Sequence, residues 1–132
     1  MLFALLCYAA EDDPERTGPA VSPQEWEALT AADAAHPPEP PRPARLVGDH
    51  LLEAPSEAVS VLPVDGEVFA VTGPFLQVRA CLAGVRLIEC EDREHAVEIA
   101  RSCRMTERFR CVEVRPVRDR RPAPTAGARD WS

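Results

Sequence analysis

Seven strand-like or helix-like segments follow one another along this chain, and their order constrains the fold more than any other feature. They are a strand over 2–7, a helix over 22–35, a strand over 45–52, a hairpin over 58–72, a strand over 81–90, a helix over 91–103 and a strand over 110–117. Two strand–helix–strand units with a hairpin between them predict an α+β, ferredoxin-like sheet with both helices on one face.

The other face of such a sheet has no helix to cover it. An apolar sheet face in water promotes association, so we expect a homodimer in which two open faces meet and form a cleft on each copy. The first strand fits this arrangement because both of its faces are apolar, which is typical of a central strand. Its alternating side chains are Phe3, Leu5 and Cys7 on one side and Leu2, Ala4 and Leu6 on the other.

The first helix has clear start and stop signals. Ser22, Pro23 and Glu25 form a capping box with proline at the first helical position. The helix should end near Ala35, because residues 37–43 contain five prolines and suit an extended chain. One face of this helix begins apolar and turns polar along its length, with Trp26, Leu29, Thr30 and Asp33.

The hairpin and the end of the domain also have local signals. Asp65 and Gly66 lie between two strand-like arms and predict a type I′ turn. Asp92 is the expected N-cap of the second helix. Residues 1–117 are expected to form one domain. Residues 118–132 contain one large apolar side chain and are predicted to be a disordered tail.

Composition excludes several classes of protein. With 132 residues, of which 45% are hydrophobic, the chain can bury one core. Its longest apolar run, residues 1–7, is far shorter than the roughly 20 residues of a membrane span, so no membrane segment is expected. The net charge of −7 argues against a dedicated nucleic-acid binder, which needs concentrated positive potential.

Cysteine and arginine usage indicate where the protein works. The five cysteines form no C-x-x-C pair and are odd in number, which suits reduced thiols in the cytoplasm. All 15 basic residues are arginine, a bias expected of a GC-rich bacterial genome. We therefore expect a cytoplasmic bacterial protein, and burial explains the Cys7 thiol better than reactivity does.

Several segments of the chain resemble the YCII-related superfamily, and more closely its DGPF-type branch. They are MLFALLCY at the start, SPQEWEAL at the first helix, DGEVFAVTGPF through the hairpin, LAGVRLIECEDREHAVEIA across a strand and helix, and VEVRPV near the end. Together they span residues 1–117. The resemblance implies a dimeric α/β barrel, which agrees with the fold expected from the segment order.

The signature of the DGPF-type branch is altered in this chain. The usual run reads close to DGPFAETKE, whereas residues 72–80 read TGPFLQVRA. Thr72, Gln77 and Ala80 stand where three carboxylates are expected, and Arg79 stands where a lysine is expected. Either the pocket has been rebuilt for a different ligand, or the function of that polar cluster has been lost.

The densest polar cluster of the sequence contains Asp49, His50 and Glu53, at the end of the second strand and beside the expected cleft. A histidine can transfer protons near neutral pH, so His50 is the candidate acid or base. Adjacent strand residues point to opposite faces, so Asp49 cannot orient His50 within one pocket. The alternative is that His50 has a surface or hydrogen-bonded structural role. Asp49, Glu53 and Thr72 are candidate substrate-binding residues.

Arg86 lies inside an apolar strand, where a charge needs a partner. Strict alternation places it on one face with Leu82, Gly84 and Ile88, over the space that the glycine leaves. A guanidinium in that position suits recognition of an anionic group such as a carboxylate.

A second explanation of Arg86 has equal weight, namely an internal ion pair with an acid such as Glu113 or Glu89. Arg79 is the other candidate for anion recognition, because of its place in the altered signature.

No metal or cofactor site is predicted. The three histidines and five cysteines lack the ligand spacing of a structural zinc site. The turn over 73–75 lacks the glycine-rich repeat and the following lysine of a phosphate loop. His95, in the first turn of the second helix, is expected to be a solvated surface residue.

Two functions follow. The leading hypothesis is a cofactor-independent enzyme that acts on a small, anionic or cyclic metabolite by proton transfer, in an elimination, isomerisation or cyclisation. His50 would be its acid/base, and Arg79 and Arg86 would anchor the substrate. The alternative is a non-catalytic accessory or regulatory module that binds a ligand or a sigma-factor-type partner, which the loss of the signature carboxylates favours.

Overall fold

The computed structural model of the chain describes residues 1–10, 18–38, 41–75 and 80–118, apart from the side chain of Met105. The strands and helices follow the predicted order, with two short helical turns in addition. They are β1 (Leu2–Ala10), α1 (Pro23–Ala35), β2 (Arg45–Leu51), the 3-10 turn η1 (Pro55–Glu57), β3 (Val59–Val64), β4 (Glu67–Thr72), β5 (Ala80–Glu89), α2 (Arg93–Ser102), α3 (Met105–Arg108) and β6 (Cys111–Pro116).

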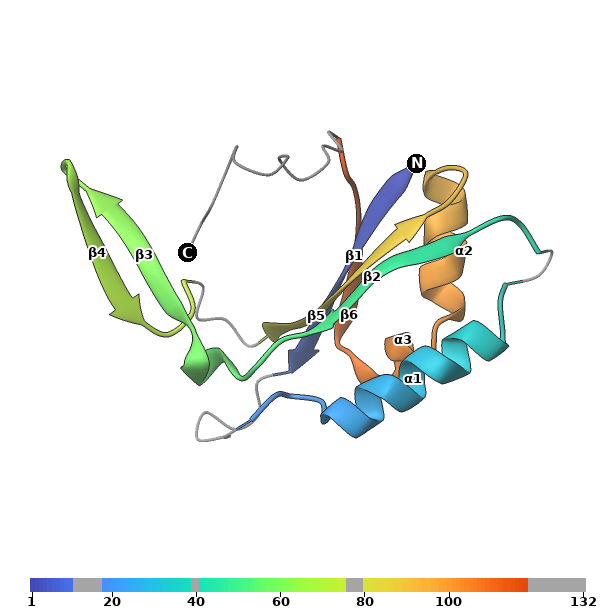
Figure 1. Ribbon diagram of the computed structural model, residues 1–132, viewed down its shortest axis with the longest axis horizontal. Helices are drawn as coiled ribbons and strands as arrows, with labels where there is room; N and C mark the ends of the chain where they lie inside the picture. Colours follow the sequence, from blue (N-terminus) through green and yellow to red (C-terminus); the bar gives the residue numbers. More distant parts are fainter. Residues whose placement is uncertain (11–17, 39–40, 76–79, 119–132) are drawn as a thin grey trace, which may run out of the picture.

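Four strands form one antiparallel sheet in the order β2-β5-β1-β6. β1 lies inside this sheet between β5 and β6, as its two apolar faces predict. The helices α1, α2 and α3 all lie on one side of the sheet (Figure 1). This α+β arrangement is compatible with a ferredoxin-like fold.

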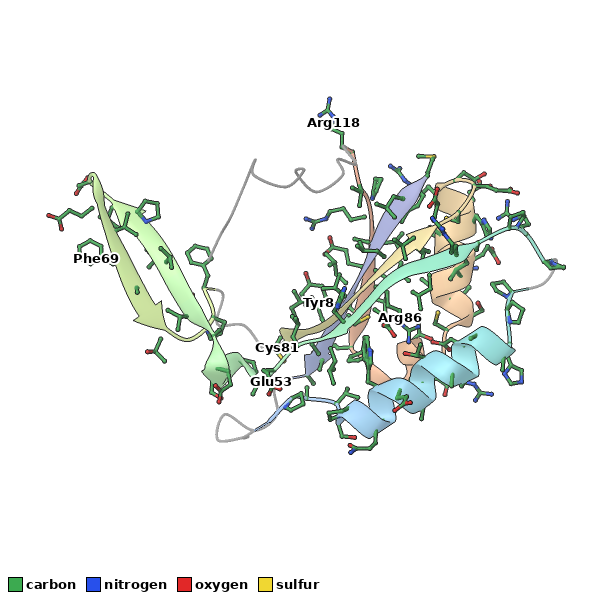
Figure 2. The ribbon with its side chains drawn as sticks, viewed as in Figure 1. Tyr8, Glu53, Phe69, Cys81, Arg86 and Arg118 are labelled. Carbon is green, nitrogen blue, oxygen red and sulfur yellow. The ribbon has the colours of Figure 1, made fainter. Side chains whose placement is uncertain are left out.

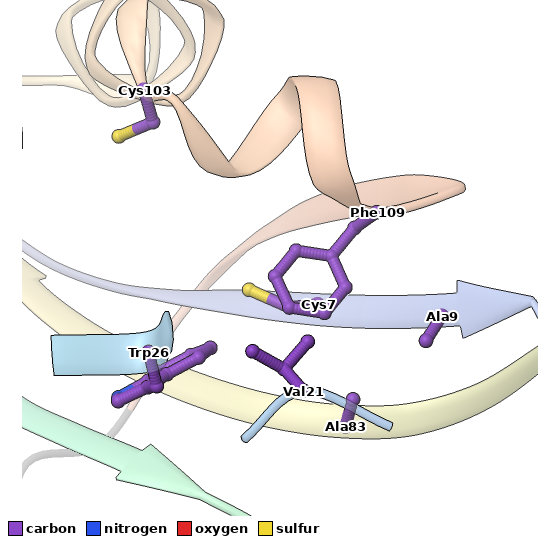
Figure 3. Packing of buried hydrophobic residues seen from close by; sticks show 7 residues of the cluster. All are labelled: Cys7, Ala9, Val21, Trp26, Ala83, Cys103 and Phe109. Carbon is purple, nitrogen blue, oxygen red and sulfur yellow. The ribbon is translucent and has the colours of Figure 1, made fainter. Parts of the chain in front are cut away.

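The core lies between the sheet and the helices. Alternate residues of β1 point toward the helices and are buried, with Phe3 and Cys7 fully excluded from solvent. Cys7 belongs to a cluster in which the rings of Trp26 and Phe109 meet edge to face, with centroids 6.1 Å apart (Figure 3). Burial raises the pKa of the Cys7 thiol from 9.0 to about 12, so the thiol is a packing group, as predicted.

β5 contains a bulge that changes which side chains face the core. Leu82 pairs with Tyr8, whereas Gly84 pairs with the residue just before Tyr8, so Ala83 is an extra residue. Ala83 and Gly84 are both buried, and Leu82 is 37% exposed. The prediction that Leu82 shares a face with Arg86 is therefore wrong, because alternation fails at the extra residue.

Gly84 brings a helix unusually close to the sheet. A Cβ atom at this position would lie 2.3 Å from Cη2 of Trp26, a distance that real Cβ contacts do not show. The absence of a side chain thus allows the indole of α1 to lie directly on β5.

The helix caps follow the sequence signals. Ser22 Oγ accepts a hydrogen bond from the backbone N–H of Glu25 at 3.1 Å, and α1 ends at Ala35 as predicted. The Glu25 carboxylate accepts a bond from Arg108 Nε at 2.7 Å. Asp92 caps α2 by accepting from the backbone N–H of His95 at 2.8 Å.

The prediction of a solvated His95 is wrong. Its ring is buried, with 3% of the residue exposed, and Nδ1 accepts a hydrogen bond from the backbone N–H of Glu91 at 3.2 Å. The ring therefore satisfies a backbone donor that precedes α2, which a neutral imidazole can do.

The hairpin of β3 and β4 forms a separate two-stranded sheet that projects away from the four-stranded sheet, on the side opposite the helices (Figure 1). Asp65 and Gly66 have φ angles of 49° and 82°, as the predicted type I′ turn requires. Large apolar side chains are exposed on both faces of this hairpin: Val59, Val61, Val64, Val68, Phe69 and Val71.

Candidate functional site

Arg86 is the centre of a buried polar cluster between the sheet and α1 (Figure 2). Its Nε donates to Asp49 Oδ1 at 2.9 Å, and its Nη1 donates to Asp33 Oδ2 at 2.8 Å. Its Nη2 donates to Thr30 Oγ1 at 2.7 Å. We call Arg86, Asp33, Asp49 and Thr30 the Arg86 cluster.

Three elements hold the Arg86 cluster in place. Asp49 lies directly opposite Arg86 in the β2–β5 register, so their side chains share the helix-covered face. Thr30 and Asp33 are three residues apart on α1 and therefore face the sheet together. Thr30 Oγ1 also lies 2.7 Å from Asp49 Oδ2. The ring of Trp26 lies 5.2 Å from the guanidinium carbon and covers it.

The electrostatics of the Arg86 cluster are set by its two carboxylates. Burial alone would lower the pKa of Arg86, but the hydrogen bonds and charges of Asp33 and Asp49 outweigh it and the pKa is raised. The nearby Cys103 thiol has its pKa raised to about 11, first by burial and then by the charge of Asp33. Further negative charge is therefore disfavoured in this region.

Of the two explanations of Arg86, the structure contains the internal ion pair. The partners are not the acids that the sequence suggested, because Glu113 lies on the opposite face beside Tyr8 and Glu89 pairs with Arg45. The actual partners are Asp33, from a helix distant in sequence, and Asp49.

A cavity of about 320 Å³ lies against the Arg86 cluster, between the sheet, α1, α2 and the start of the proline segment. We call it the helix-side cavity. Most of its wall is apolar. Thr30, Asp33 and Arg86 form one polar part of the wall, and His36, Arg45 and Ser102 are its other polar residues. Its wall includes Leu5, Ala34, Ile88, Ile99 and Cys103.

His50 lies on the other face of the sheet. It pairs with Val85, whereas its neighbour Asp49 pairs with Arg86, so the two side chains point to opposite faces as predicted. His50 is exposed, and within the described part of the chain its ring has no hydrogen-bond partner. The predicted constellation in which Arg86 anchors a substrate for His50 is therefore wrong for a single copy, because a sheet separates them.

The remaining predicted site residues are scattered. Glu53 lines a hollow of about 550 Å³ near the base of the hairpin, together with Tyr8, Leu82 and Phe75. Thr72 is exposed at the end of β4 and pairs with Val59. Arg79 lies outside the described residues.

Thr30 and Asp33 complete the Arg86 cluster and Trp26 covers it, and the sequence did not identify these three as site residues. The sequence feature that could have identified Thr30 and Asp33 is the polar end of the buried face of α1. An acid and a hydroxyl on the buried side of a helix need a buried partner. Arg86, the charge inside an apolar strand, was that partner.

Comparison with protein families identifies the relatives of this fold. The family model described as the YCII-related domain matches residues 1–121. The chain belongs to the YCII-related family. No curated protein matches the chain. The YCII-related domain thus includes the sheet, the helices, the Arg86 cluster and the hairpin.

Within the described part of this YCII-related chain, no three His, Cys, Asp or Glu side chains converge as ligands of a metal ion. None of the helices in that part has the length and apolar character that crossing a membrane requires.

Proposed function

We propose that this YCII-related protein binds a small organic molecule in the helix-side cavity, without a cofactor. The observation that carries this proposal is the cavity itself, which combines an apolar wall with one convergent polar cluster. Binding sites for small molecules have this composition and volumes from about 300 Å³ upward. An engineered apolar cavity of about 150 Å³ holds benzene, so a single ring with one polar substituent would fit here.

Binding without turnover, as in an accessory or regulatory module, is the function that the geometry favours. The Arg86 cluster, whose members Thr30, Asp33 and Arg86 line the cavity, is already satisfied internally by hydrogen bonds. These side chains can position a ligand. The Cys103 thiol also lines the cavity beside Asp33, but burial raises its pKa to about 11, so it is a poor nucleophile at neutral pH.

Proton-transfer catalysis on the open face is the second candidate. The role of His50 as acid or base is supported by its exposed position on that face, opposite the apolar Val85 in the β2–β5 register. Such a site would need a second copy to enclose it, because one sheet face is open to water.

Filling the cavity tests the proposed function. Both alanines are exposed on α1, but Ala34 lines the cavity and Ala31 does not, so only Ala34→Phe places a ring at the cavity. Ligand-observed NMR with small ring compounds should show binding to the unchanged protein and to Ala31→Phe, and loss of it in Ala34→Phe. The proposal would be contradicted if Ala34→Phe still bound the compounds, or if the unchanged protein did not bind them.

His50→Ala separates the two candidates. If any compound is converted, and His50→Ala abolishes conversion while leaving binding in the helix-side cavity intact, catalysis on the open face is supported. If no compound is converted, the binding-module hypothesis is supported, and conversion that His50→Ala leaves unchanged would exclude His50 as the acid or base.

The predicted homodimer belongs to the same proposal. The open face of the sheet measures roughly 20 Å by 20 Å, from four strands about 4.8 Å apart and the six-residue length of β6, the shortest of them. With the apolar hairpin added, this is of the order of the roughly 800 Å² that each partner buries in a stable interface. We propose that a second copy covers the open face and the hairpin, and that the protein works in the cytoplasm, where thiols such as those of Cys7, Cys90 and Cys103 remain reduced.

A further inference from the structure

The charge balance of the Arg86 cluster distinguishes the kinds of ligand that the helix-side cavity can accept. One guanidinium faces two carboxylates, and the side chains of Arg86, Asp33 and Asp49 are 4%, 10% and 19% exposed. The cluster therefore carries one excess negative charge in a region where water screens it poorly.

Arg86 has little capacity left for an anionic ligand. Its Nε, Nη1 and Nη2 each donate to an oxygen of the cluster, and the ring of Trp26 covers one face of the guanidinium. These bonds use three of the five N–H groups, and a carboxylate that reached the other two would bring a third negative charge beside Asp33 and Asp49. The structure thus argues against the anion-binding role expected for this arginine.

Asp33 is the carboxylate that a ligand can reach, because it lines the cavity and Asp49 does not. Its Oδ2 accepts from Arg86 and its Oδ1 accepts from the backbone N–H of Arg104 at 2.7 Å. The Cys103 thiol also interacts with this carboxylate. Each carboxylate oxygen can accept two hydrogen bonds, so Asp33 still retains acceptor capacity for a ligand donor.

The other charged groups of the cavity wall do not reverse this balance. Arg45, at the opposite rim, is bound to Glu89 at 2.9 Å and its side chain is 70% exposed. His36 is exposed, and its Nδ1 lies 3.1 Å from the backbone oxygen of Ala32. Both groups are in contact with water, which weakens their field inside the cavity.

We propose that the helix-side cavity selects a small organic cation, an amine whose apolar ring or chain fills the cavity while its ammonium group binds Asp33. This inference rests on the proposed function and adds the class of ligand. The ammonium would donate to the free acceptors of Asp33, and its charge would neutralise the excess charge of the Arg86 cluster.

Three ligands of nearly equal size test this preference, namely benzylamine, benzyl alcohol and benzoate, together with the corresponding cyclohexyl compounds. Ligand-observed NMR gives each Kd. The fluorescence of Trp26 reports binding beside Arg86, measured in Trp131→Phe because the chain has two tryptophans. Within each series we expect the ammonium to bind at least tenfold more tightly than the carboxylate, with the alcohol between them.

Asp33→Asn identifies the group responsible. It removes the excess charge of the cluster, so the preference for ammonium over carboxylate should fall at least fivefold. Asp65→Asn makes the same change in net charge at the tip of the hairpin, far from the cavity, and should leave the preference unchanged. Equal effects of the two variants would overturn the inference, because the preference would then reflect the charge of the whole protein.

The outcomes separate the ligand class from the proposed function. If the carboxylate or the alcohol binds as tightly as the ammonium in unchanged protein, the cavity is a binding site but the cation preference is wrong. If no compound of either series binds, the proposed function fails and the inference fails with it. The comparison in unchanged protein decides the ligand class even if Asp33→Asn does not fold.

Discussion

The four-stranded sheet and the β3–β4 hairpin are both made of strands rich in apolar residues, yet only the sheet buries them. Phe3 in β1 is fully buried, whereas Phe69 in β4 is 47% exposed. The difference arises from the neighbours, since helices cover one face of the sheet and nothing in the described chain covers either face of the hairpin. A strand pattern therefore determines local structure, but the partner that covers it determines stability.

The largest expected effect comes from removing the charge at the centre of the sheet's polar cluster. Arg86→Met would leave Asp33 and Asp49 buried without their cation, and should lower the free energy of unfolding by roughly 3–5 kcal/mol. Chemical denaturation measures this loss. Arg108→Met is the control, because its ion pair with Glu25 is exposed and is worth about 1 kcal/mol or less. Similar losses for both variants would show that burial does not distinguish the two ion pairs.

Contact between α1 and the sheet is tested by adding a methyl group. Gly84→Ala would push against the buried ring of Trp26 and should cost roughly 1–3 kcal/mol of unfolding free energy. Gly48→Ala is the matched variant, since its Cβ would meet the exposed His50 ring at 3.3 Å and that ring can move. Equal thermal stability of the two variants would contradict the close approach at Gly84.

Alkaline pH should lower the free energy of unfolding because the buried thiols have raised pKa values. Below pH 9, Cys7 is protonated in both folded and unfolded chains, so its contribution to stability does not change with pH. Between pH 9 and about 12, the unfolded chain loses the proton first, and stability should fall by roughly 1.4 kcal/mol per pH unit for this thiol. Cys103 adds a similar slope up to about pH 11.

Thermal unfolding across this pH range measures the alkaline slope. Cys7→Ser should reduce it, whereas Cys111→Ser, at an exposed thiol, should not. An unchanged slope in Cys7→Ser would show that this thiol is not shielded from water in solution.

Changes in the hairpin should have the smallest effect on folding and a separate effect on association. Val68→Thr combined with Phe69→Ser should change the unfolding free energy of a single copy by less than about 0.5 kcal/mol, because both side chains are exposed. If a second copy covers the hairpin, sedimentation velocity should show weaker dimerisation. A loss of several kcal/mol in dilute protein would mean that the hairpin packs within its own chain.

The sequence predicted the elements better than their partners. Periodicity, the caps at Ser22 and Asp92 and the Asp65-Gly66 turn are local signals, and each strand or helix begins within about two residues of its expected position. The sequence also identified Arg86 as a charge in need of a partner. It could not identify Asp33 as that partner, because 53 residues separate them and only the folded arrangement brings them together.

The alternation of side chains predicted the faces of β5 only in part. The faces of β5 could be assigned correctly from Arg86 onward, but the bulge at Ala83 placed Leu82 on the opposite face. Nothing in the sequence distinguishes a bulged strand from a regular one here, since Leu82, Ala83 and Gly84 suit either.

The bulge at Ala83 also has a consequence for how the length of this chain can vary. Deleting Ala83 would make Leu82 and Gly84 adjacent, restore regular pairing with β1 and leave every other side chain of β5 on its present face. A deletion elsewhere within the strand would turn one part of it over and expose core residues. Homologues that are one residue shorter in this strand should therefore have lost the residue here.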